Sequence, residues 1–239
     1  NTVYTVSSFN TFLYAGGSFT TSGATDLFKI AKWDGANWVP LGVGMDDGNV
    51  YAMRVLGTSL YVGGTFTMIG ASPVNRIARW DGNSWANLGF GFSSGVYSLS
   101  ASGSLLYAGG DFDFANLVPA SKVAIWNGSS WSPAGSGISG TGSIVRSLAL
   151  YNTFMTAAGR FTTAGGSPAS NISRWGNPVG ITQNGNSVPN EYNLSQNYPN
   201  PFNPSTKIDF DIPASANVEL SLYDISGKEI QILFSGYLD

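Results

Sequence analysis

The chain of 239 residues contains no cysteine and no histidine, and only 10% of its residues are charged. The absence of cysteine excludes a disulfide scaffold, a thiolate nucleophile and cysteine-based zinc or iron–sulfur sites. The absence of histidine excludes Ser-His-Asp triads and imidazole metal ligands. We therefore expect a protein that is not an enzyme and that carries neither a metal site nor a cofactor.

The chain also has little net charge and no long apolar run. Its net charge of −3 argues against nucleic acid as a partner, because phosphate binding requires a basic surface. No run of about 18 apolar residues occurs, so we predict no transmembrane segment. Since the chain starts at Asn1 without a methionine or a signal peptide, we expect a processed or trimmed form.

What the chain does contain is an internal repeat. The block Leu-Tyr-x-Gly-Gly-x-Phe-Thr occupies residues 13–20 and 60–67, returns without its last residue at 106–112, and has decayed at 155–162. Two aromatic markers step by the same 47, 46 and 49 residues: Trp33, Trp80, Trp126 and Trp175, and Phe19, Phe66, Phe112 and Phe161. Two independent markers with one spacing indicate repeated structural units.

Each repeat predicts four short β-strands. Aromatic and β-branched residues alternate between turn residues, and Asp-Gly or Asn-Gly separates the last two strands as a tight hairpin turn. Four strands in about 46 residues are typical of a β-propeller blade, so we predict an all-β fold. Residues 1–180 then hold about three and three-quarter blades, which cover 2–44, 49–91, 95–137 and 143–175. We expect either a fragment of a longer propeller or an open array that another copy closes.

The composition changes after the repeats. Residues 1–180 hold 28 of the 31 glycines and all 7 tryptophans. Residues 181–191 are predicted to be a linker, because the surrounding stretch is polar and contains prolines and glycines. Beyond it, apolar residues alternate over 207–212 and 218–222, and a Ser-Gly-Lys turn leads into 230–233. This pattern predicts a small antiparallel β-module over residues 192–239.

The module carries the spaced proline motif Tyr198-Pro199-Asn200-Pro201-Phe202-Asn203-Pro204 and, later, Tyr-Asp-Ile-Ser-Gly-Lys-Glu over 223–229. These residues resemble the C-terminal sorting domain of type IX secretion cargo in Bacteroidota. The resemblance implies an immunoglobulin-like β-sandwich, incomplete at residue 239, that contacts the secretion machinery. It also implies a secreted protein or one on the outer surface of a Gram-negative cell. Taken by itself, the proline-rich stretch is also consistent with a stiff linker.

The repeat half is similar to propeller-type repeats of bacterial surface proteins and of a fungal cortical marker family. The shared blocks are Leu-Tyr-x-Gly-Gly-x-Phe-Thr and Trp-Asp-Gly-x-x-Trp. This resemblance implies the fold and a surface setting, and it implies no ligand, because propellers host unrelated functions.

Candidate ligand-binding residues are Trp38, Trp85 and Trp131, which follow the hairpin turns. Indole rings can stack on sugars, and we expect these three to be more exposed than the other tryptophans. Their strict repetition equally predicts a core between blades. The basic positions Lys29, Arg76 and Lys122 could attract an acidic polysaccharide or could protect strand edges.

The aspartates have alternatives of their own. Asp34 and Asp81 could act as acids or bases, but the third repeat has Asn127 at this position, so turn chemistry explains all three better. Asp111 with Asp113, and Asp46 with Asp47, could bind Ca²⁺, but neither pair matches a calcium-loop spacing. Solvated surface is the simpler interpretation of both pairs.

These observations predict a surface-associated β-propeller protein, exported by type IX secretion, that acts by binding or as a structural protein. Self-assembly, adhesion and binding of polysaccharide are the expected activities. The alternative is an accessory propeller module of an exported carbohydrate-active enzyme.

Overall fold

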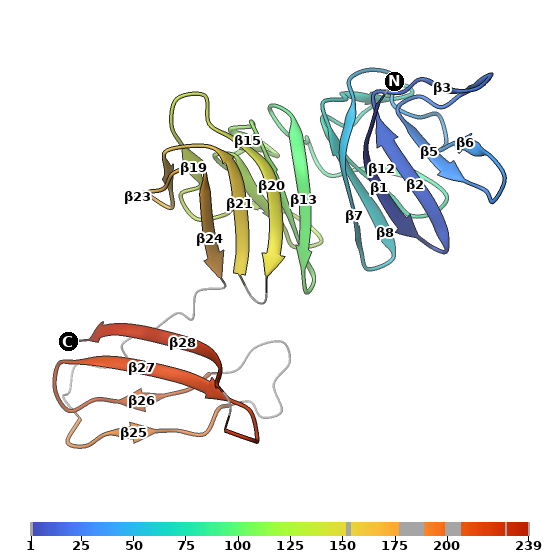
Figure 1. The fold of residues 1–239 in the computed structure, drawn as a ribbon. Coiled ribbons are helices and arrows are strands. Elements are labelled where there is room, and N and C mark those ends of the chain that lie inside the picture. Colours follow the sequence, from blue (N-terminus) through green and yellow to red (C-terminus); the bar gives the residue numbers. More distant parts are fainter. Residues whose placement is uncertain (1, 152–153, 177–188, 199–206, 228, 239) are drawn as a thin grey trace. The chain divides into compact units, whose positions relative to one another are not determined.

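The computed structural model describes residues 2–151, 154–176, 189–198, 207–227 and 229–238 (Figure 1). The chain divides into two compact units, a repeat unit of residues Asn1–Asn177 and a tail unit of residues Pro178–Asp239. The described residues form an all-β fold, and no helix among them could cross a membrane.

Antiparallel sheets repeat along the first unit and form four propeller-like blades. Blade 1 pairs β1 (Val3–Phe9), β2 (Phe12–Gly17), β5 (Ile30–Trp33) and β6 (Trp38–Pro40) in that order. Blade 2 pairs β7 (Val50–Leu56), β8 (Ser59–Gly64), β11 (Ile77–Trp80) and β12 (Trp85–Asn87). Blade 3 pairs β13 (Val96–Ser102), β14 (Leu105–Gly110), β17 (Val123–Trp126) and β18 (Trp131–Pro133). The described part of blade 4 pairs three strands, β20 (Ile144–Tyr151), β21 (Phe154–Arg160) and β24 (Ile172–Gly176).

The connection between the second and third strand of each blade folds into a small ribbon of its own. The ribbons are β3 (Thr21–Ser22) with β4 (Thr25–Asp26), β9 (Met68–Ile69) with β10 (Ser72–Pro73), and β15 (Phe114–Ala115) with β16 (Val118–Pro119). In blade 4 the ribbon is β22 (Thr163–Ala164) with β23 (Ser167–Pro168), and β22 also pairs with β19 (Ile138–Ser139). These connections are therefore short hairpins.

The hairpin turns between the third and fourth strands are held by one side-chain acceptor. Asp81 Oδ1 accepts from the backbone N–H groups of Asn83 and Ser84 at 2.8 and 2.7 Å. Asn127 Oδ1 does the same for Ser129 and Ser130, both at 2.9 Å. The two hydrogen bonds that Asp81 accepts, first the one from Ser84 and then the one from Asn83, hold the pKa of its carboxyl below its usual range. In each turn only the glycine that follows takes a positive φ, such as 106° at Gly82.

Each blade presents two different faces, which we call the valine face and the glycine face. In blade 2 the valine face carries Val50, Met53 and Leu60, and the glycine face carries Tyr61, Gly63 and Ile77. The valine faces of blades 2, 3 and 4 each pack on the glycine face of the preceding blade. The three resulting clusters contain Tyr14, Ile30, Val50, Met53 and Leu60; Tyr61, Ile77, Val96, Leu99 and Leu106; and Tyr107, Val123, Val145, Leu148 and Met155.

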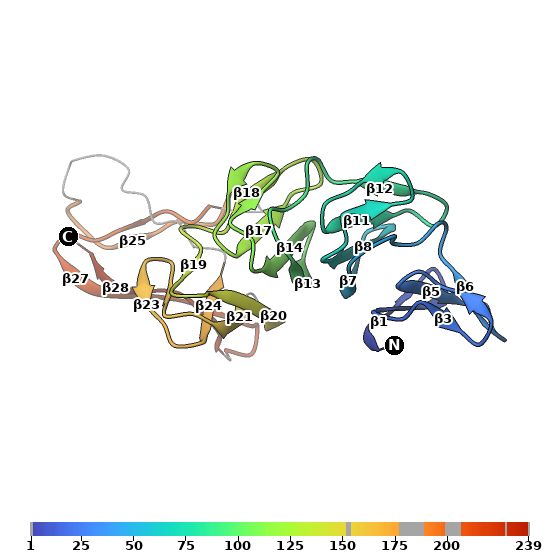
Figure 2. The ribbon, with the colours of Figure 1, turned by 90° about the horizontal axis from the view of Figure 1, so that it is seen from above.

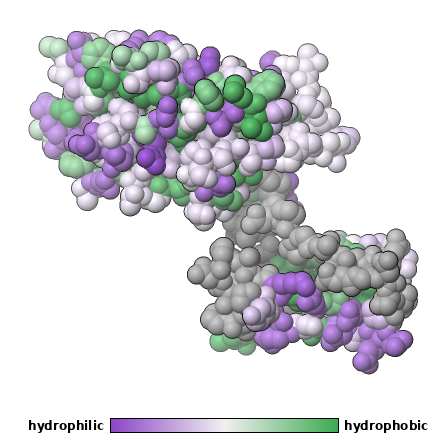
Figure 3. All heavy atoms as spheres, turned by 180° about the vertical axis from the view of Figure 1, so that it is seen from behind, coloured by the Kyte–Doolittle hydropathy of each residue, from purple (hydrophilic) through white to green (hydrophobic). Residues whose placement is uncertain are grey.

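The core of the repeat unit therefore lies between blades, which follow one another in chain order (Figure 2). Glycine is required on the receiving strand because the next blade approaches so closely. A Cβ atom on Gly63 would lie 2.6 Å from Val96 Cγ1, and one on Gly109 would lie 2.6 Å from Val145 Cγ1. Apolar side chains also reach the surface of this unit, as the hydrophobic patches in Figure 3 show.

The tail unit is built differently. Its described strands form two ribbons, β25 (Asn193–Leu194) with β26 (Phe210–Asp211), and β27 (Ala216–Tyr223) with β28 (Glu229–Leu238). None of its residues whose burial is described is fully buried. The two ribbons do not by themselves make a sandwich, so the immunoglobulin-like fold of this module stays a prediction.

Candidate functional site

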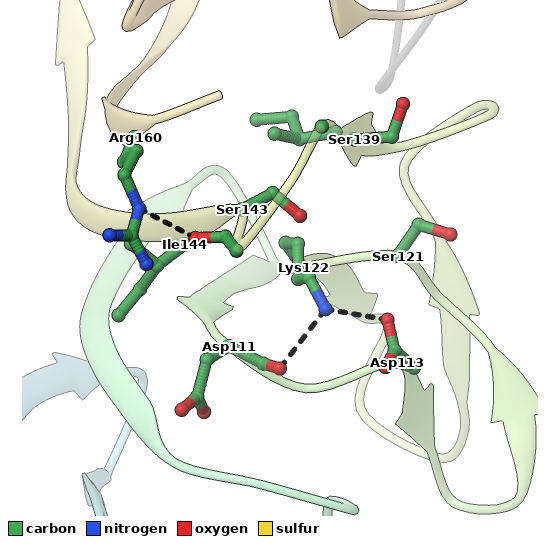
Figure 4. Close-up of a pocket in the computed structure, with 11 residues that line it drawn as sticks. Asp111, Asp113, Ser121, Lys122, Ser139, Ser143, Ile144 and Arg160 are labelled. Carbon is green, nitrogen blue, oxygen red and sulfur yellow. Dashed lines mark hydrogen bonds and ion pairs between the residues drawn. The ribbon is translucent and has the colours of Figure 1, made fainter. Parts of the chain in front are cut away.

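A polar pocket of about 540 Å³ lies at the junction of blades 3 and 4 (Figure 4). Four charged residues, two from each sign, and three serines line it: Asp111, Asp113, Lys122, Arg160, Ser121, Ser139 and Ser143. Its apolar lining is restricted to Ile138 and Ile144. The volume falls in the range of small-molecule sites, but the lining is far more polar than usual.

The pocket arises from a longer connection between blades. The connection into blade 4 runs from Gly137 to Val145. It is two or three residues longer than the corresponding connections into blades 2 and 3, which run over 44–50 and 91–96. Gly140, Gly142 and Ser143 of this longer connection line one side of the pocket. Sequence analysis missed this site because its signal was only a small length difference between repeats.

Lys122 lies at the centre of the pocket in a fixed position. Its Nζ donates to Asp113 Oδ1 at 2.6 Å and to the backbone carbonyl of Asp111 at 3.1 Å, and its side chain is only 12% exposed. Its φ of 73° follows a φ of 35° at Ser121, so two successive residues take the left-handed conformation. The ammonium group therefore neutralises Asp113 and fastens this unusual turn to the end of β14.

The same turn recurs in blade 1. Lys29 has a φ of 70° and its Nζ donates to the carbonyl of Ser18 at 3.3 Å. In blade 2, Arg76 has a φ of 74° and donates instead to the carbonyl of Phe92 at 2.8 Å. These three basic side chains are thus engaged with backbone carbonyls, which explains their repetition without an acidic ligand.

Asp111 joins the pocket to the innermost strands. Figure 4 shows its carboxylate turned away from Lys122, and Oδ2 accepts a hydrogen bond from the Tyr97 hydroxyl at 3.2 Å. Burial, together with the negative charge of Asp111, raises the pKa of Tyr97. Asp111 Oδ1 is buried and accepts no hydrogen bond from the described residues. Asp111 is therefore an acceptor with spare capacity beside the pocket.

Arg160 closes the opposite side of the pocket. Its Nε donates to the carbonyl of Gly142 at 2.7 Å, which ties β21 to the extra loop. The position of Arg160 corresponds to Asp111 in blade 3 and to Thr65 in blade 2, judged by the strand register. The fourth repeat thus supplies a cation where the third supplies an anion, so the pocket has balanced charge.

A row of aromatic rings runs along the first strands of blades 1 to 3. The rings of Tyr4 and Tyr51 stack with centroids 4.9 Å apart, and those of Tyr51 and Tyr97 meet edge to face at 5.2 Å. The guanidinium of Arg146 extends the row from blade 4, 4.9 Å from the Tyr97 ring centroid. Sequence analysis did not single out these tyrosines, because their contact depends on how neighbouring blades pack.

The three candidate tryptophans differ in their surroundings. Trp38 and Trp85 are half-buried, and each tilts against the other tryptophan of its blade, at 5.5 and 5.1 Å. The indole N–H of Trp85 donates to the carbonyl of Leu41 in the preceding blade at 3.3 Å. Neither residue lines the pocket.

Trp131 is less exposed than the sequence analysis predicted. It is only 4% exposed, because its ring packs edge to face on Phe92 of the preceding blade, with centroids 4.7 Å apart. The prediction that Trp131 is more exposed than the other tryptophans is wrong, because Trp80 and Trp126 are more exposed than it is. Phe92 replaces Met45 of the first junction, and the aromatic pair it forms with Trp131 covers the indole.

Most residues of the predicted sorting motif lie outside the described residues: Pro199, Asn200, Pro201, Phe202, Asn203 and Pro204. Tyr198 is described and is 80% exposed. Its backbone N–H and C=O exchange two hydrogen bonds of 2.9 Å with Lys207, as in an antiparallel bridge. The residues on either side of the proline-rich segment are therefore held together.

The described aspartates have partners that bear on their chemistry. Asp47 accepts from the backbone and hydroxyl of Thr67, both at 2.7 Å, and these hydrogen bonds outweigh burial, so its pKa is lowered. Asp34 holds its turn as Asp81 does, and its pKa is lowered by hydrogen bonds from Asn37 and Ala36. Among the described residues, no three acidic side chains gather into a metal site. These carboxylates act as structural acceptors.

Comparison with known proteins finds no matching family model and no matching curated protein. Among solved structures, the chain is similar to the computationally designed Ika4 protein, with 12% identity and a TM-score of 0.47 over 73% of this chain and 91% of the designed one. It is also similar to the computationally designed Ika8 protein, with 14% identity and a TM-score of 0.46 over 73% of this chain and 45% of that one. The strand pairing described above, independently of these similarities, defines the repeat unit as an all-β array of propeller-like blades.

Proposed function

We propose that this chain is a secreted or cell-surface binding protein that recognises a small neutral, hydroxyl-rich ligand in the pocket between blades 3 and 4. The observation that carries the proposal is the balanced charge of the lining, two carboxylates against an ammonium and a guanidinium. A charged ligand would be attracted by two of these four side chains and repelled by the other two, so it would gain no net electrostatic attraction. The exposed Asp113 carboxylate and the serine hydroxyls favour a ligand that both donates and accepts hydrogen bonds.

Recognition here would depend on hydrogen bonds, because no aromatic ring lines the pocket. A sugar of one or two rings has the required chemistry, and it would use the Asp113 carboxylate, Arg160 and the serines as partners. The pocket suits binding without turnover, because its carboxylates lack the features of an acid–base pair. Asp113 is neutralised by Lys122, and Asp111 is directed at Tyr97.

The test is calorimetric titration of the 239-residue chain with neutral mono- and disaccharides, and with sugar acids and amino sugars as charged comparisons. We expect saturable binding of at least one neutral sugar and weaker binding of its charged relatives. Arg160→Ala should weaken binding roughly tenfold or more, the value of a hydrogen bond to a charged group. Arg54→Ala removes an exposed arginine far from the lining and should leave binding unchanged.

The Trp85→Ala variant tests whether the sugar is bound by the pocket or by the tryptophans. If Trp85→Ala abolishes binding without unfolding the chain while Arg160→Ala does not, recognition belongs to the half-buried indoles and the pocket proposal fails. Release of reducing sugar by the purified chain would instead support the alternative, an accessory propeller module of an exported carbohydrate-active enzyme with chemistry of its own.

Export through the type IX machinery is the second part of the proposal, and it is supported by the motif around Tyr198 and by the later Tyr-Asp-x-x-Gly-Lys-Glu residues. In a bacterium that has this system, removal of residues 192–239 should retain the protein inside the outer membrane. Cell fractionation with antibody detection measures this, and surface exposure of the shortened chain would contradict the proposal. The expected setting on the outer surface also accommodates the adhesive or self-assembling roles.

A further inference from the structure

Blade 3 carries an asparagine where blades 1 and 2 carry an aspartate. Asn127 begins the turn between β17 and β18, and Asp34 and Asp81 begin the equivalent turns of the first two blades. Asn127 is followed by Gly128, and both residues are exposed. The backbone nitrogen of a glycine can attack the side-chain amide of the residue before it, because glycine has no side chain to obstruct the approach. The turn of blade 3 therefore contains an amide that can be lost as ammonia, which the other two turns lack.

The attacking nitrogen of Gly128 is accessible. A Cβ atom built on Gly128 would meet no atom within 4 Å outside the adjacent residues, and no hydrogen bond between described residues occupies its N–H. Its φ of 101° is one that glycine adopts readily and other residues do not, so the fold itself requires the unobstructed residue here. Nitrogen and amide belong to one turn, so the attack is intramolecular.

The oxygen of the Asn127 amide is surrounded by hydrogen-bond donors. Asn127 Oδ1 accepts from the backbone N–H groups of Ser129 and Ser130, both at 2.9 Å, and from the Ser129 hydroxyl at 3.0 Å. The Ser130 hydroxyl is a fourth donor, at 3.4 Å. Addition of the Gly128 nitrogen to the amide carbon places negative charge on this oxygen, and donors directed at such an oxygen lower the barrier to addition. The turn thus supplies the stabilisation that the oxyanion requires.

We propose that Asn127 is a site of spontaneous deamidation, which converts the turn of blade 3 into the Asp-Gly turn of blades 1 and 2. The Gly128 nitrogen loses its proton and bonds to the amide carbon, and ammonia leaves to give a cyclic imide. Water then opens the ring, so one asparagine and one water yield one aspartate and one ammonia. Opening at the side-chain carbonyl gives aspartate, whereas opening at the backbone carbonyl gives isoaspartate.

The chain itself shows what the two products would do. Asp34 and Asp81 accept from the equivalent backbone N–H groups of their turns at 2.7 to 2.8 Å, so aspartate at position 127 should hold the turn and add one negative charge. Isoaspartate lengthens the backbone and should disturb the register that pairs Trp126 with Trp131. The conversion does not depend on the sugar pocket, because none of these turn residues lines it.

Incubation of the 239-residue chain at mildly alkaline pH, followed by peptide mapping with mass spectrometry, tests the proposal. We expect Asn127 to gain the mass that replacement of NH₂ by OH adds. The rate should be roughly tenfold or more above that of Asn83, which lies in the matching turn of blade 2 but precedes a serine, whose side chain obstructs the attack. Ser129→Ala should slow the conversion severalfold, because it removes a donor to the oxyanion.

Two variants of Asn127 serve as matched controls. Asn127→Asp should co-elute with the main deamidated species on ion exchange and should keep the melting temperature of the parent at neutral pH. Asn127→Gln should not convert, because its longer side chain would have to close a larger ring. An unchanged Asn127 in a sample in which Asn184, which precedes Gly185, has converted would overturn the proposal by showing that the folded turn protects the amide. Equal rates at Asn127 and Asn83 would overturn it as well, and an unaltered rate in Ser129→Ala would overturn the part assigned to the hydroxyl.

Discussion

The repeat unit and the tail unit use the same secondary structure in opposite ways. In the repeat unit, the first and second strands of each blade face other blades, and side chains such as Phe66 and Phe112 are fully buried. In the tail unit, none of the residues with described burial reaches that state. The repeat unit carries about two more basic than acidic residues, and residues 181–239 carry seven acidic residues against two basic ones. A repeated sheet obtains its core from its neighbours, whereas two separate ribbons have no neighbour to supply one.

The largest expected difference between the units concerns core truncation. Phe112→Ala should lower the free energy of unfolding of the repeat unit by about 3–5 kcal/mol, because it leaves a cavity at a junction between blades. Ile225→Ala, at a fully exposed tail residue, should change stability by less than about 0.5 kcal/mol. Denaturant titration followed by tryptophan fluorescence measures the first and circular dichroism the second. Similar effects at both positions would mean that the tail unit has a core of its own.

A smaller effect tests the close approach of blades. Gly63→Ala should destabilise the repeat unit by about 1–3 kcal/mol, because the added methyl group overlaps Val96. The reverse change at the equivalent position of blade 4, Ala158→Gly, should cost less than about 1 kcal/mol, since none of the other described blades packs there and the change acts mainly through backbone entropy. Thermal unfolding of the two variants compares them directly. Equal costs would indicate that the glycines serve the strand itself and not the junction.

Acid should weaken the hairpin turn that Asp81 holds, and the Asp81→Asn substitution isolates this contribution to stability. The folded pKa of Asp81 lies below its ordinary value of 3.8, so its contribution to stability is present above that value and is lost as pH falls through the folded pKa. Asp81→Asn keeps the acceptor, as Asn127 does in blade 3, and removes the titration. The variant should therefore lose less stability than the parent between neutral pH and about pH 2. Melting temperatures across this range provide the measurement, and identical acid profiles would show that the turn does not stabilise the charged form.

The smallest expected effect is that of removing the tail unit. A chain ending at Asn177 should keep the unfolding free energy of the repeat unit within about 0.5 kcal/mol, because the inter-blade clusters contain no tail residue. Chemical unfolding monitored by tryptophan fluorescence reports on this unit alone, because all 7 tryptophans precede residue 178. A clear loss of stability would show that the two units are energetically coupled.

The repeated aromatic spacing was enough to predict the four blades, because each blade needs the same turn, glycine and tryptophan positions. The sequence also predicts three strands for the fourth blade, since Gly180 stands where the next tryptophan would fall, and the described residues contain these three. The pocket could not be predicted in this way, because it joins residues from two blades across a connection that differs in length. The burial of Trp131 depends in the same way on Phe92, a residue outside its own blade.

The paired tryptophans have a spectroscopic consequence. Trp33 with Trp38, Trp80 with Trp85, and Trp126 with Trp131 hold their rings 5.1 to 5.5 Å apart at interplanar angles of 47° to 59°. Two indoles so close and so tilted couple their electronic transitions, which adds a signed exciton band to the circular dichroism of each blade. Replacing one indole of a pair by phenylalanine would remove the exciton band of that blade from the spectrum. The protein thus contains three separately addressable optical labels, with which the order of blade unfolding can be read without attaching a dye.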